Sequence, residues 1–299
     1  MHRFTLDQLA TLVALIEAGT FEAAAPRLHV TPSAVSQRVK AMEHASGRVL
    51  VQRTTPVRLT AAGDVLLRYA RQVELLEADT LRALRVGAEP GRPFLVSLAV
   101  NADSLDTWFL DALTGMGEHL GVAFDLRRED QEHTTTLLRA GTVMAAVTST
   151  REPVQGCVTE ELGVMRYRAV STPAFRSRWL SPESDRGTLA DAPVVTFDRN
   201  DDLQAAFLRT HVGRSGTGLT HFVPTSNDFA RAVAREFGWG LLPEQQCLAD
   251  IREGRLVELA PEHPVDLPLY WQRWNLVSPL LDDISTAVRA EATRALRPF

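Results

Sequence analysis

The sequence predicts an α/β protein that has a winged helix-turn-helix at its N-terminal end, a long helix after it, and a larger part of alternating strands and helices. Three observations predict this fold. Short amphipathic helical patterns with tight turns fill residues 5–47. A helical pattern without proline spans residues 60–87. Beyond residue 94, strand and helix patterns alternate over roughly 200 residues, which indicates a mostly parallel sheet.

The composition is that of a soluble globular protein of one to three domains. The chain has 299 residues, of which 45% are hydrophobic and 23% charged. Its apolar runs are far shorter than the ~20 residues that span a bilayer. Asp7 and Glu17 interrupt the first apolar stretch, so no signal peptide is expected. We therefore expect a cytoplasmic protein without a membrane partner. Cys157 and Cys247 show no metal-ligand or disulfide spacing and are expected to be reduced thiols.

Charge is distributed unevenly along the chain. Residues 1–88 carry eleven Lys and Arg against eight Asp and Glu, whereas the remaining residues carry twenty-one against twenty-nine. A basic end on an acidic body indicates that only the first part meets a polyanion. A DNA-architectural protein would be basic throughout, so that class is disfavoured.

Three short helices are expected at the N-terminal end. Residues 5–18 have apolar side chains at helical spacing, with Thr5 as the N-cap and Gly19 as the end of the helix. An alanine-rich segment, 21–28, forms the second helix and allows close helix packing. Pro32 suits the first position of the third helix.

The third helix separates into two faces. Its two valines and Met42 gather on one side of a helical wheel, and the polar side chains gather on the other: Ser33, Ser36, Gln37, Lys40 and His44. In a major groove, Gln37 could pair with adenine and Lys40 with guanine acceptors. An ordinary solvated helix has the same two faces, so this pattern alone does not decide between the two interpretations.

The segment after the third helix is typical of a wing. Residues 49–63 form a short extended pair around a Thr-Pro turn, and arginines flank that turn. Arg38 lies nearer the apolar side of the third helix, so either the DNA backbone or a neighbouring helix could be its partner. The candidate DNA-binding residues are Thr31, Ser33, Ser36, Gln37, Arg38, Lys40, Arg53 and Arg58.

The long helix carries an apolar stripe: Val65, Leu66, Tyr69, Val73, Leu76, Leu81 and Leu84. A Gly/Pro-rich linker, residues 87–94, follows it. A second chain is the expected cover for the stripe, and a dimer would supply two reading helices for two DNA half-sites. A core helix of a larger domain is the alternative.

In the C-terminal part, strands are expected at 94–100, 121–130, 143–149, 192–198, 220–225 and 267–274. Helices are expected at 108–120, 133–141, 202–211, 227–238 and 279–297. Ligands in open α/β sheets bind beyond the carboxyl ends of strands. Polar side chains at those ends are the candidate ligand contacts: Ser97, Asn101, Asp103, Ser104, Thr148, Asp198, Thr225 and Asn227. Several of them could be simple N-caps instead.

No motif indicates catalysis or a metal. GxSxG, HExxH, GxxxxGK[ST] and GxGxxG are absent from suitable contexts, and the eight histidines show no ligand spacing. We therefore expect no enzyme, no catalytic or metal-binding residues, and no cofactor. A solute-binding protein of the transport class would share a cleft, but it would need a secretion signal and would lack the helix-turn-helix.

The N-terminal region resembles the LysR-type transcriptional regulators. The resemblance implies a winged helix-turn-helix (1–60), a linker helix that forms a dimer (61–88), and an effector domain (89–299) like the periplasmic binding proteins. The expected subdomains are about 92–165 plus 268–299, and about 166–267. The residues that carry the resemblance are Ala24, Ala25, Leu28, Thr31, Ser33, Ala34, Ser36, Glu43, Gly47, Leu50, Arg53, Leu59, Thr60, Ala62 and Gly63.

Further segments resemble the arginine/lysine-responsive branch of that family, which controls export of basic amino acids. They are residues 21–24, 33–38, 71–77, 95–113, 192–208 and 269–274. The resemblance implies promoter DNA, a homodimer or homotetramer, RNA polymerase, and lysine or arginine as effector. Val51 departs from the usual Leu-Phe pair before Arg. A LysR-type regulator with a different small-molecule effector is the alternative.

Overall fold

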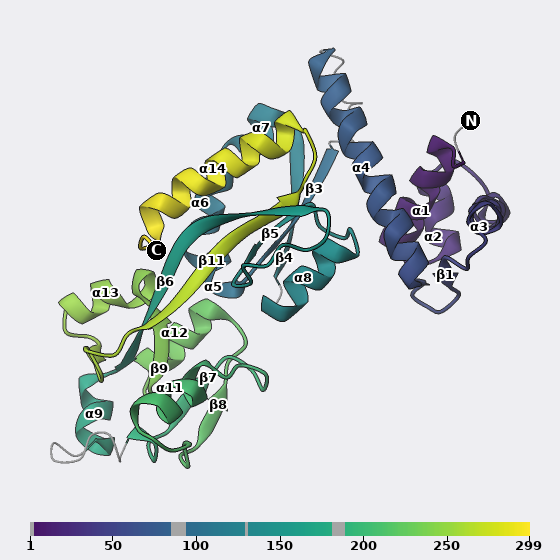
Figure 1. Cartoon of the computed structure of the whole chain (residues 1–299). Helices are drawn as coiled ribbons and strands as arrows, with labels where there is room; N and C mark the ends of the chain where they lie inside the picture. Colours follow the sequence, from purple (N-terminus) through teal and green to yellow (C-terminus); the bar gives the residue numbers. More distant parts are fainter. Residues whose placement is uncertain (1–2, 85–93, 129–130, 181–188) are drawn as a thin grey trace.

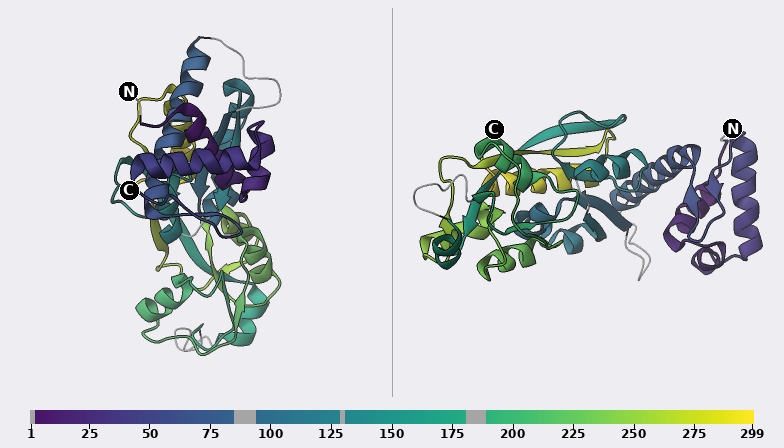
Figure 2. Two further views of the ribbon diagram at one scale, coloured as in Figure 1. Left: turned by 90° about the vertical axis from the view of Figure 1, so that its right-hand side faces the viewer. Right: turned by 90° about the horizontal axis from the view of Figure 1, so that it is seen from below.

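The computed structural model describes residues 3–84, 94–128, 131–180 and 189–299, without the side chains of 131–133 (Figure 1). Most of the expected linker, 87–94, and the expected boundary near residue 88 lie outside the described residues. A helical N-terminal end is joined through one long helix to an α/β part with two lobes. One lobe contains residues 94–128, 131–148 and 279–299, and the other contains residues 173–180 and 189–252. Figure 2 shows that the first helices project away from both lobes.

The N-terminal end folds as the sequence predicts, with three helices and a two-stranded wing. Thr5, Thr20 and Thr31 cap the three helices, Pro32 begins the third, and Gly19 ends the first at φ 75°. Leucines and alanines of the first two helices pack with Val35, Val39 and Met42 in one core. The elements are α1 (Leu6–Ala18), α2 (Phe21–Arg27), α3 (Pro32–Ser46), β1 (Val51–Gln52) and β2 (Arg58–Leu59).

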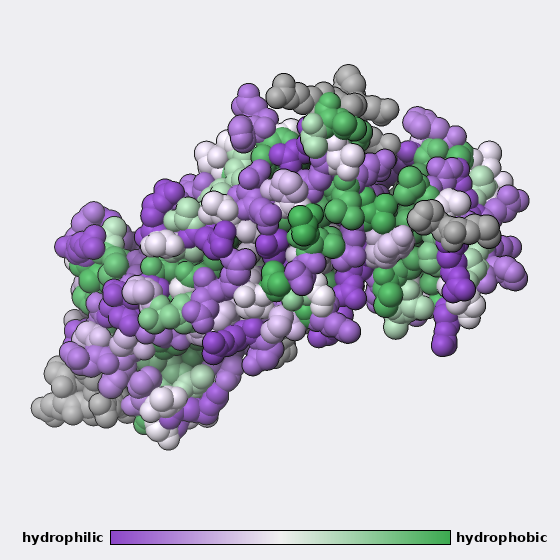
Figure 3. All heavy atoms as spheres, turned by 45° about the horizontal axis from the view of Figure 1, so that its top comes forward, coloured by the Kyte–Doolittle hydropathy of each residue, from purple (hydrophilic) through white to green (hydrophobic). Residues whose placement is uncertain are grey.

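The long helix α4 (Ala61–Ala83) begins at Thr60, whose side chain accepts a hydrogen bond from the Gly63 N–H. The expectation that a second chain covers its whole apolar stripe is wrong in part. Leu66 packs into the N-terminal core, and Leu75, outside the predicted stripe, packs into the core of the α/β part. The remaining large side chains of the stripe stay exposed, except the half-buried Val73: Val65, Tyr69, Leu76, Leu81 and Leu84. Figure 3 shows apolar residues on the surface between the two ends of the molecule, where α4 lies.

The sheet of the α/β part is mixed, so the expected mostly parallel sheet is wrong. Its order is β10-β6-β11-β5-β3-β4, with β9 beside β6; only the β3–β4 and β3–β5 pairs are parallel. A separate parallel pair is β7–β8. The strands are β3 (Phe94–Val100), β4 (Val122–Arg128), β5 (Ala145–Thr148), β6 (Cys157–Ser171), β7 (Val194–Thr196), β8 (Thr220–Phe222), β9 (Gly240–Pro243), β10 (Val257–Glu258) and β11 (Val265–Trp274).

Strand β6 has no counterpart in the sequence-based prediction, although it decides the topology. It pairs with β11 from Cys157 to Tyr167, with an irregularity between Leu269 and Tyr270 of β11, and its last residues pair with β9 and β10. It therefore continues through both lobes. Met165, Tyr167 and Ala169 are buried and alternate with two arginines. That period of two was the available signal for a strand.

Helices flank both lobes (Figure 1). The single helix expected at 108–120 is instead broken: a π-helical turn (Leu105–Phe109) precedes α6, and Gly115 at φ 74° separates α6 from α7. The helices are α5 (Ala102–Ser104), α6 (Leu110–Leu113), α7 (Met116–Leu120), α8 (Gln131–Arg139), α9 (Pro173–Trp179), α11 (Leu203–His211), α12 (Ser226–Ala234), α13 (Glu244–Arg252) and α14 (Pro279–Ala295).

The core of the α/β part extends across the sheet and under α14. Trp108, Trp271 and Trp274 are fully or almost fully buried in it. Both cysteines are buried free thiols, and burial raises the pKa of Cys157 to about 11. Among the described residues, no helix is long and apolar enough to cross a membrane. The exact domain limits drawn from the sequence stay predictions.

Candidate functional site

One candidate site is the exposed face of α3, which lies at the end of the molecule away from the two lobes (Figure 2). Ser33, Gln37 and Lys40 are exposed on it, Ser36 is half-buried, and Val35 and Val39 are fully buried on the opposite face. The helix therefore presents amide, hydroxyl and ammonium groups outward from a rigid base. Such groups can hydrogen-bond to base edges in a major groove.

Three of the candidate DNA-binding side chains have hydrogen-bond partners within the protein: Thr31, Ser33 and Arg38. The hydroxyls of Thr31 and Ser33 are hydrogen-bonded to each other at 2.9 Å. The Thr31 hydroxyl caps α3 by accepting from the Ala34 N–H at 3.3 Å. Arg38 donates to Oγ1 of Thr11 and to Oδ2 of Asp7, both at 3.2 Å. Of the two partners considered for Arg38, the neighbouring helix is therefore the one seen, and its guanidinium fixes α3 against α1.

The wing carries the other two arginines. Arg53 and Arg58 are exposed on either side of the turn between β1 and β2. The Arg53 guanidinium lies over the Phe21 ring, with its Cζ 5.3 Å from the ring centroid. This contact directs Arg53 without using its hydrogen-bond donors, which remain available for phosphate oxygens.

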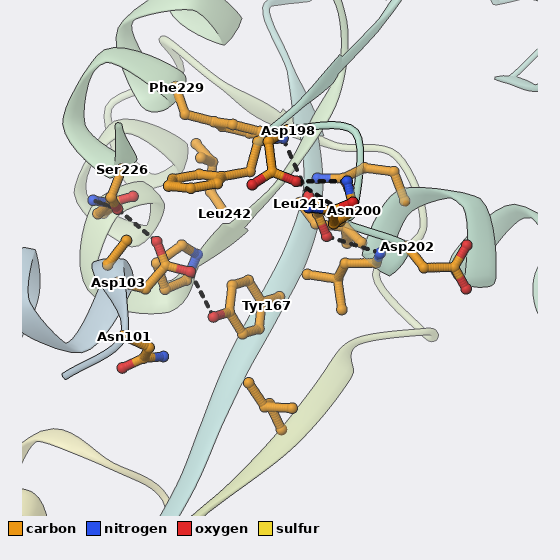
Figure 4. Close-up of a pocket in the computed structure, with 18 residues that line it drawn as sticks. Asn101, Asp103, Tyr167, Asp198, Asn200, Asp202, Ser226, Phe229, Leu241 and Leu242 are labelled. Carbon is orange, nitrogen blue, oxygen red and sulfur yellow. Dashed lines mark hydrogen bonds between the residues drawn. The ribbon is translucent and has the colours of Figure 1, made fainter. Parts of the chain in front are cut away.

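The second candidate site is a pocket of about 660 Å³ between the two lobes (Figure 4). Polar residues reach it from the end of β3, from β6, from the loop after β7, and from the first turns of α12 and α13. This volume is in the range of small-molecule sites. Its lining residues are Asn101, Ala102, Asp103, Tyr167, Phe197, Asp198, Asn200, Asp201, Asp202, Leu203, Gln204, Ser226, Phe229, Leu241, Leu242, Pro243, Gln246 and Leu267.

Asp103 is the most enclosed carboxylate of the pocket. Its two oxygens accept hydrogen bonds of 2.6 Å from the hydroxyls of Tyr167 and Ser226, as Figure 4 shows. Burial raises the pKa of the Asp103 carboxyl, although these two hydrogen bonds favour the charged form. Burial and the nearby Asp103 also raise the pKa of Tyr167 well above its ordinary value, so Tyr167 acts as a hydrogen-bond donor.

Three further aspartates follow β7 in the loop before α11. Asp198 accepts from the N–H groups of Asn200 and Asp201, which fixes the turn. Asp201 accepts from the Phe197 and Leu203 N–H groups, and burial raises the pKa of its carboxyl, assisted by the charges of Asp198 and Asp103. Asp202 is paired with Arg209 of α11.

Neutral acceptors add to this negative environment. The buried side-chain oxygens of Asn101, Gln204 and Gln246 have no hydrogen-bond partner, and all three residues line the pocket. Gln246 uses its amide nitrogen on Asp106 and Ser226, which leaves its oxygen as the free group. Buried acceptors without donors are costly, so the pocket is suited to a ligand that supplies several N–H groups. No Lys, Arg or His is among the described residues that line it.

The pocket brings together three of the eight candidate ligand residues: Asn101, Asp103 and Asp198. Among the other five, Ser97 and Thr148 are buried in the sheet, where Ser97 donates to Asp125 and Thr148 accepts from the Thr150 N–H. The Ser104 hydroxyl is buried without a partner, Thr225 donates to Asp228, and Asn227 is exposed. The structure does not place these five at the pocket lining.

Sequence reasoning missed Tyr167 and Gln246 as pocket residues. Ser226, Asp201 and Asp202 also line the pocket, although they are not among the eight candidate ligand residues. Tyr167 belongs to the unpredicted strand β6, where the alternation with Arg166 and Arg168 was the usable signal. Gln246 sits on α13 and offers no local motif.

Two family profiles together match most of the chain. The profile of the bacterial regulatory helix-turn-helix proteins of the lysR family matches residues 6–64, and that of the LysR substrate binding domain matches residues 95–293. The chain belongs to the LysR family of bacterial transcriptional regulators. The resemblance seen in the sequence and the fold expected from it are thereby confirmed.

Several LysR-family proteins are similar to this chain over their full length. The lysine export transcriptional regulatory protein LysG of Corynebacterium glutamicum is 42% identical over 294 residues, which cover 97% of this chain and 99% of that protein. A crystal structure of ArgP from Mycobacterium tuberculosis has a TM-score of 0.86 at 43% identity, covering 98% of both chains. Full-length LysG from Corynebacterium glutamicum with bound effector Arg has a TM-score of 0.79 at 41% identity, covering 99% of this chain and 100% of that chain.

Proposed function

We propose that this LysR-family regulator binds a basic amino acid, lysine or arginine, in the pocket between its lobes and thereby controls a gene for a basic-amino-acid exporter. The observation that carries this proposal is the excess of acceptors: four aspartates and three unpartnered amide oxygens line the pocket without a lining cation. The similar LysG with bound Arg, and the lysine-export name of its curated counterpart, support the same ligand class and target.

A basic amino acid brings the charges that this pocket needs. Its side-chain cation and α-ammonium group offset the buried carboxylates of Asp103 and Asp201, whose burial otherwise favours the neutral form. The α-carboxylate requires donors, which the Asn101 amide can supply. We infer that Asn101, Asp103 and Asp198 contact the ligand, together with Tyr167 and Ser226.

The regulator acts by differential binding to two states. A ligand that draws together α5 in one lobe and α12 in the other stabilises one relative position of the lobes, and it changes DNA affinity only if that position differs in its fit to DNA. We infer action by binding, without chemical turnover and with no cofactor beyond the amino acid, in the cytoplasm where its promoter DNA lies.

The exposed side of α4 is the surface through which we expect two copies of the chain to associate. Large apolar side chains are exposed at four positions of α4 and at its C-cap Leu84, which is unusual unless a partner covers them. We infer a homodimer through α4, which places two α3 helices on promoter DNA, with a tetramer as its further assembly and RNA polymerase as a partner on the promoter. The functional division is 1–60 for DNA, 61–88 for dimerisation and 89–299 for the effector.

Thermal melting with each of the twenty amino acids tests the ligand class. A ligand present at a hundred times its dissociation constant adds about 2.7 kcal/mol to the stability of the folded state. Lysine or arginine should raise the melting temperature, whereas leucine and glutamate should not. No shift with either basic amino acid at millimolar concentration would overturn the proposal, and a shift with another metabolite class would indicate a different effector.

A gel-shift assay tests the target. The protein should bind the DNA upstream of a neighbouring transporter gene more tightly than an unrelated fragment, and the basic amino acid should change that affinity. Equal affinity for both fragments at physiological salt would contradict control of an exporter gene.

A further inference from the structure

Arg71 of α4 lies where the DNA-binding end and the α/β part of one chain meet. The whole residue is only 4% exposed. Its Nη1 donates to the main-chain oxygen of Thr142 at 2.9 Å, and its Nη2 lies 3.4 Å from Oε1 of Glu17. Glu17 belongs to α1 of the DNA-binding end, and Thr142 belongs to the turn before β5. One guanidinium thus contacts both parts.

The surrounding face of α4 contacts the α/β part through polar side chains on both sides of one apolar side chain. Arg68 donates to the main-chain oxygen of Gln155 at 3.0 Å, and Asp79 accepts from the Leu280 N–H at 3.2 Å. Leu75 is the fully buried apolar side chain between them. These four positions recur every three or four residues, so they share one side of the helix. An interface of this composition can separate more readily than an apolar core.

The turn at Gly141 fixes how closely α4 approaches. A Cβ atom on Gly141 would lie 2.5 Å from Cα of Arg68, and the residue has φ +71°. Any side chain there would therefore push the turn away from α4, and with it the Thr142 oxygen that Arg71 holds.

Thr142 is connected to the pocket through the sheet. It lies just before β5, which pairs with β3 and with β11. Strand β3 leads directly into Asn101 and Asp103, and β11 contributes Leu267 to the pocket. A shift of this sheet on ligand binding would move the acceptor of Arg71 relative to Glu17.

We propose that Arg71 couples the DNA-binding end to the effector domain of the same chain, by holding Thr142 of the effector domain and Glu17 of α1 through one guanidinium. Within the described part of the chain the buried cation is only partly satisfied, because its Nε has no hydrogen-bond partner there and Glu17 is the carboxylate within ion-pair distance. Such a group contributes little net stability but specifies one arrangement of the groups around it. The proposal that Arg71 transmits ligand binding to the DNA-binding end rests on the proposed binding of a basic amino acid. The proposal that Arg71 holds the two parts of the chain in one arrangement does not rest on it.

The experiment uses the full chain with spin labels at Glu22→Cys in α2 and Glu118→Cys in α7, both exposed. Labelled chain is diluted into an excess of unlabelled chain, so that distances within one chain are measured by pulsed electron resonance. Arg71→Gln removes the charge and shortens the reach, and Glu17→Gln keeps the shape of the partner. Arg27→Gln is the matched control, because Arg27 pairs with the same Glu17 at 3.6 Å but belongs to the DNA-binding end.

Without ligand, both test variants should broaden the distance distribution between the labels, and the control should leave it narrow. With arginine, the wild type should change its DNA affinity by a factor in the usual range of allosteric coupling, about 5–150-fold. Arg71→Gln should reduce that factor towards one while calorimetry still finds arginine bound with wild-type affinity.

A wild-type distance distribution in both test variants would overturn the role of Arg71. If Arg71→Gln does not fold, Glu17→Gln decides by the same readout. A wild type that shows no arginine binding would instead contradict the proposed function, and the ligand-free distances would still decide whether Arg71 ties the two parts together.

Discussion

Ser226 of α12 donates a hydrogen bond of 2.6 Å to Oδ1 of Asp103 in α5, which joins a buried carboxylate of one lobe to a hydroxyl of the other. Gln246 of α13 donates to the same Ser226 hydroxyl and to Asp106. The two lobes therefore meet through acceptors that a ligand cation would also use. The same acceptor atoms therefore set the relative position of the lobes and would bind the ligand, so ligand binding can change how the lobes meet.

Asp103→Asn should weaken arginine binding strongly. The amide keeps the size of the side chain but removes the buried charge opposite the ligand cation. Loss of one partner of a buried charge pair costs about 2–5 kcal/mol, or roughly thirtyfold and upward in affinity. Isothermal calorimetry measures the effect. Asp111→Asn, exposed on α6, is the control and should bind like the wild type; equal affinity in both variants would exclude Asp103 as a ligand contact.

Arginine affinity should fall as the pH falls through the raised pKa values of Asp103 and Asp201. The cation pairs with the charged carboxylates, so below those pKa values binding must first remove protons. Calorimetry in buffers of different ionisation enthalpy should detect proton release on binding in the pH range where these carboxyls are protonated in the free protein. Binding that does not depend on pH across this range would contradict a direct pairing.

The same two carboxyls affect the stability of the ligand-free protein in the opposite sense. Their pKa values are higher in the folded state than in the unfolded state. At pH values between the unfolded and the folded pKa, the folded chain therefore binds more protons than the unfolded chain. Their contribution to stability is therefore largest below the ordinary pKa of an aspartate and is lost as the pH rises through the folded pKa. Relative to the double variant Asp103→Asn, Asp201→Asn, the wild type should become less stable over that rise, as denaturant unfolding can measure.

Glu244 should stabilise the fold mainly above its pKa. Burial opposes the charge of Glu244, but hydrogen bonds from Arg297 and Arg168 outweigh it and lower the pKa. The stabilisation is therefore present above the ordinary pKa and is lost as the pH falls through the folded value. Glu244→Gln should cost about 1.5–3 kcal/mol at neutral pH, and less in acid. The exposed Glu262→Gln should cost little; a penalty that does not shrink in acid would contradict this account.

Residues that contact bases and residues that contact phosphates should differ in how their substitution changes DNA binding, in sequence preference for the former and in salt dependence for the latter. Lys40→Ala and Gln37→Ala should each lose about 1–3 kcal/mol of discrimination between the cognate fragment and one mutated in its half-site. Arg58→Ala should weaken binding to both fragments alike and lower the salt slope by about one. Fluorescence anisotropy over a salt series provides both quantities. An undiminished preference for the cognate fragment in Lys40→Ala would remove Lys40 from the list of base readers.

The exposed face of α4 should hold the dimer. The double variant Tyr69→Asp, Leu76→Asp would place two charges in the proposed apolar interface. It should therefore sediment as a monomer at micromolar concentration. Glu77→Gln on the same helix should remain dimeric. If the double variant formed a dimer with the dissociation constant of the wild type, the dimer contact would lie on another surface.

Local signals predicted the DNA-binding end well. The caps Thr5 and Thr31, the terminator Gly19 and the initial Pro32 act within one or two turns, so their effect can be read from neighbouring residues. The period of the apolar side chains likewise fixed which face of α3 is buried. Arg38 was ambiguous because its partners, Asp7 and Thr11, lie on another helix.

The pocket was only partly predictable for the same reason. The strand-end rule placed Asn101, Asp103 and Asp198 correctly beside a pocket, because it depends on the direction of each strand alone. It also selected Ser97 and Thr148, whose side chains are buried and hydrogen-bonded to Asp125 and to the Thr150 N–H, respectively. The alternation around Tyr167 could have predicted a strand but not a pocket, because Tyr167 reaches the pocket only through the course of β6. Gln246 reaches it from α13 and has no local motif.

Residue patterns alone predicted the family, the helical DNA-binding end, the apolar surface of α4 and the acidic character of the strand-end loops. Tertiary structure decided which of those aspartates become buried together, which face of α4 is covered by its own chain, and that Arg71 lies between Glu17 and Thr142. The physical reason is range: caps, turns and periodicity act over a few residues. Burial and pairing of charges depend on residues far apart in the chain, and only the fold brings them together.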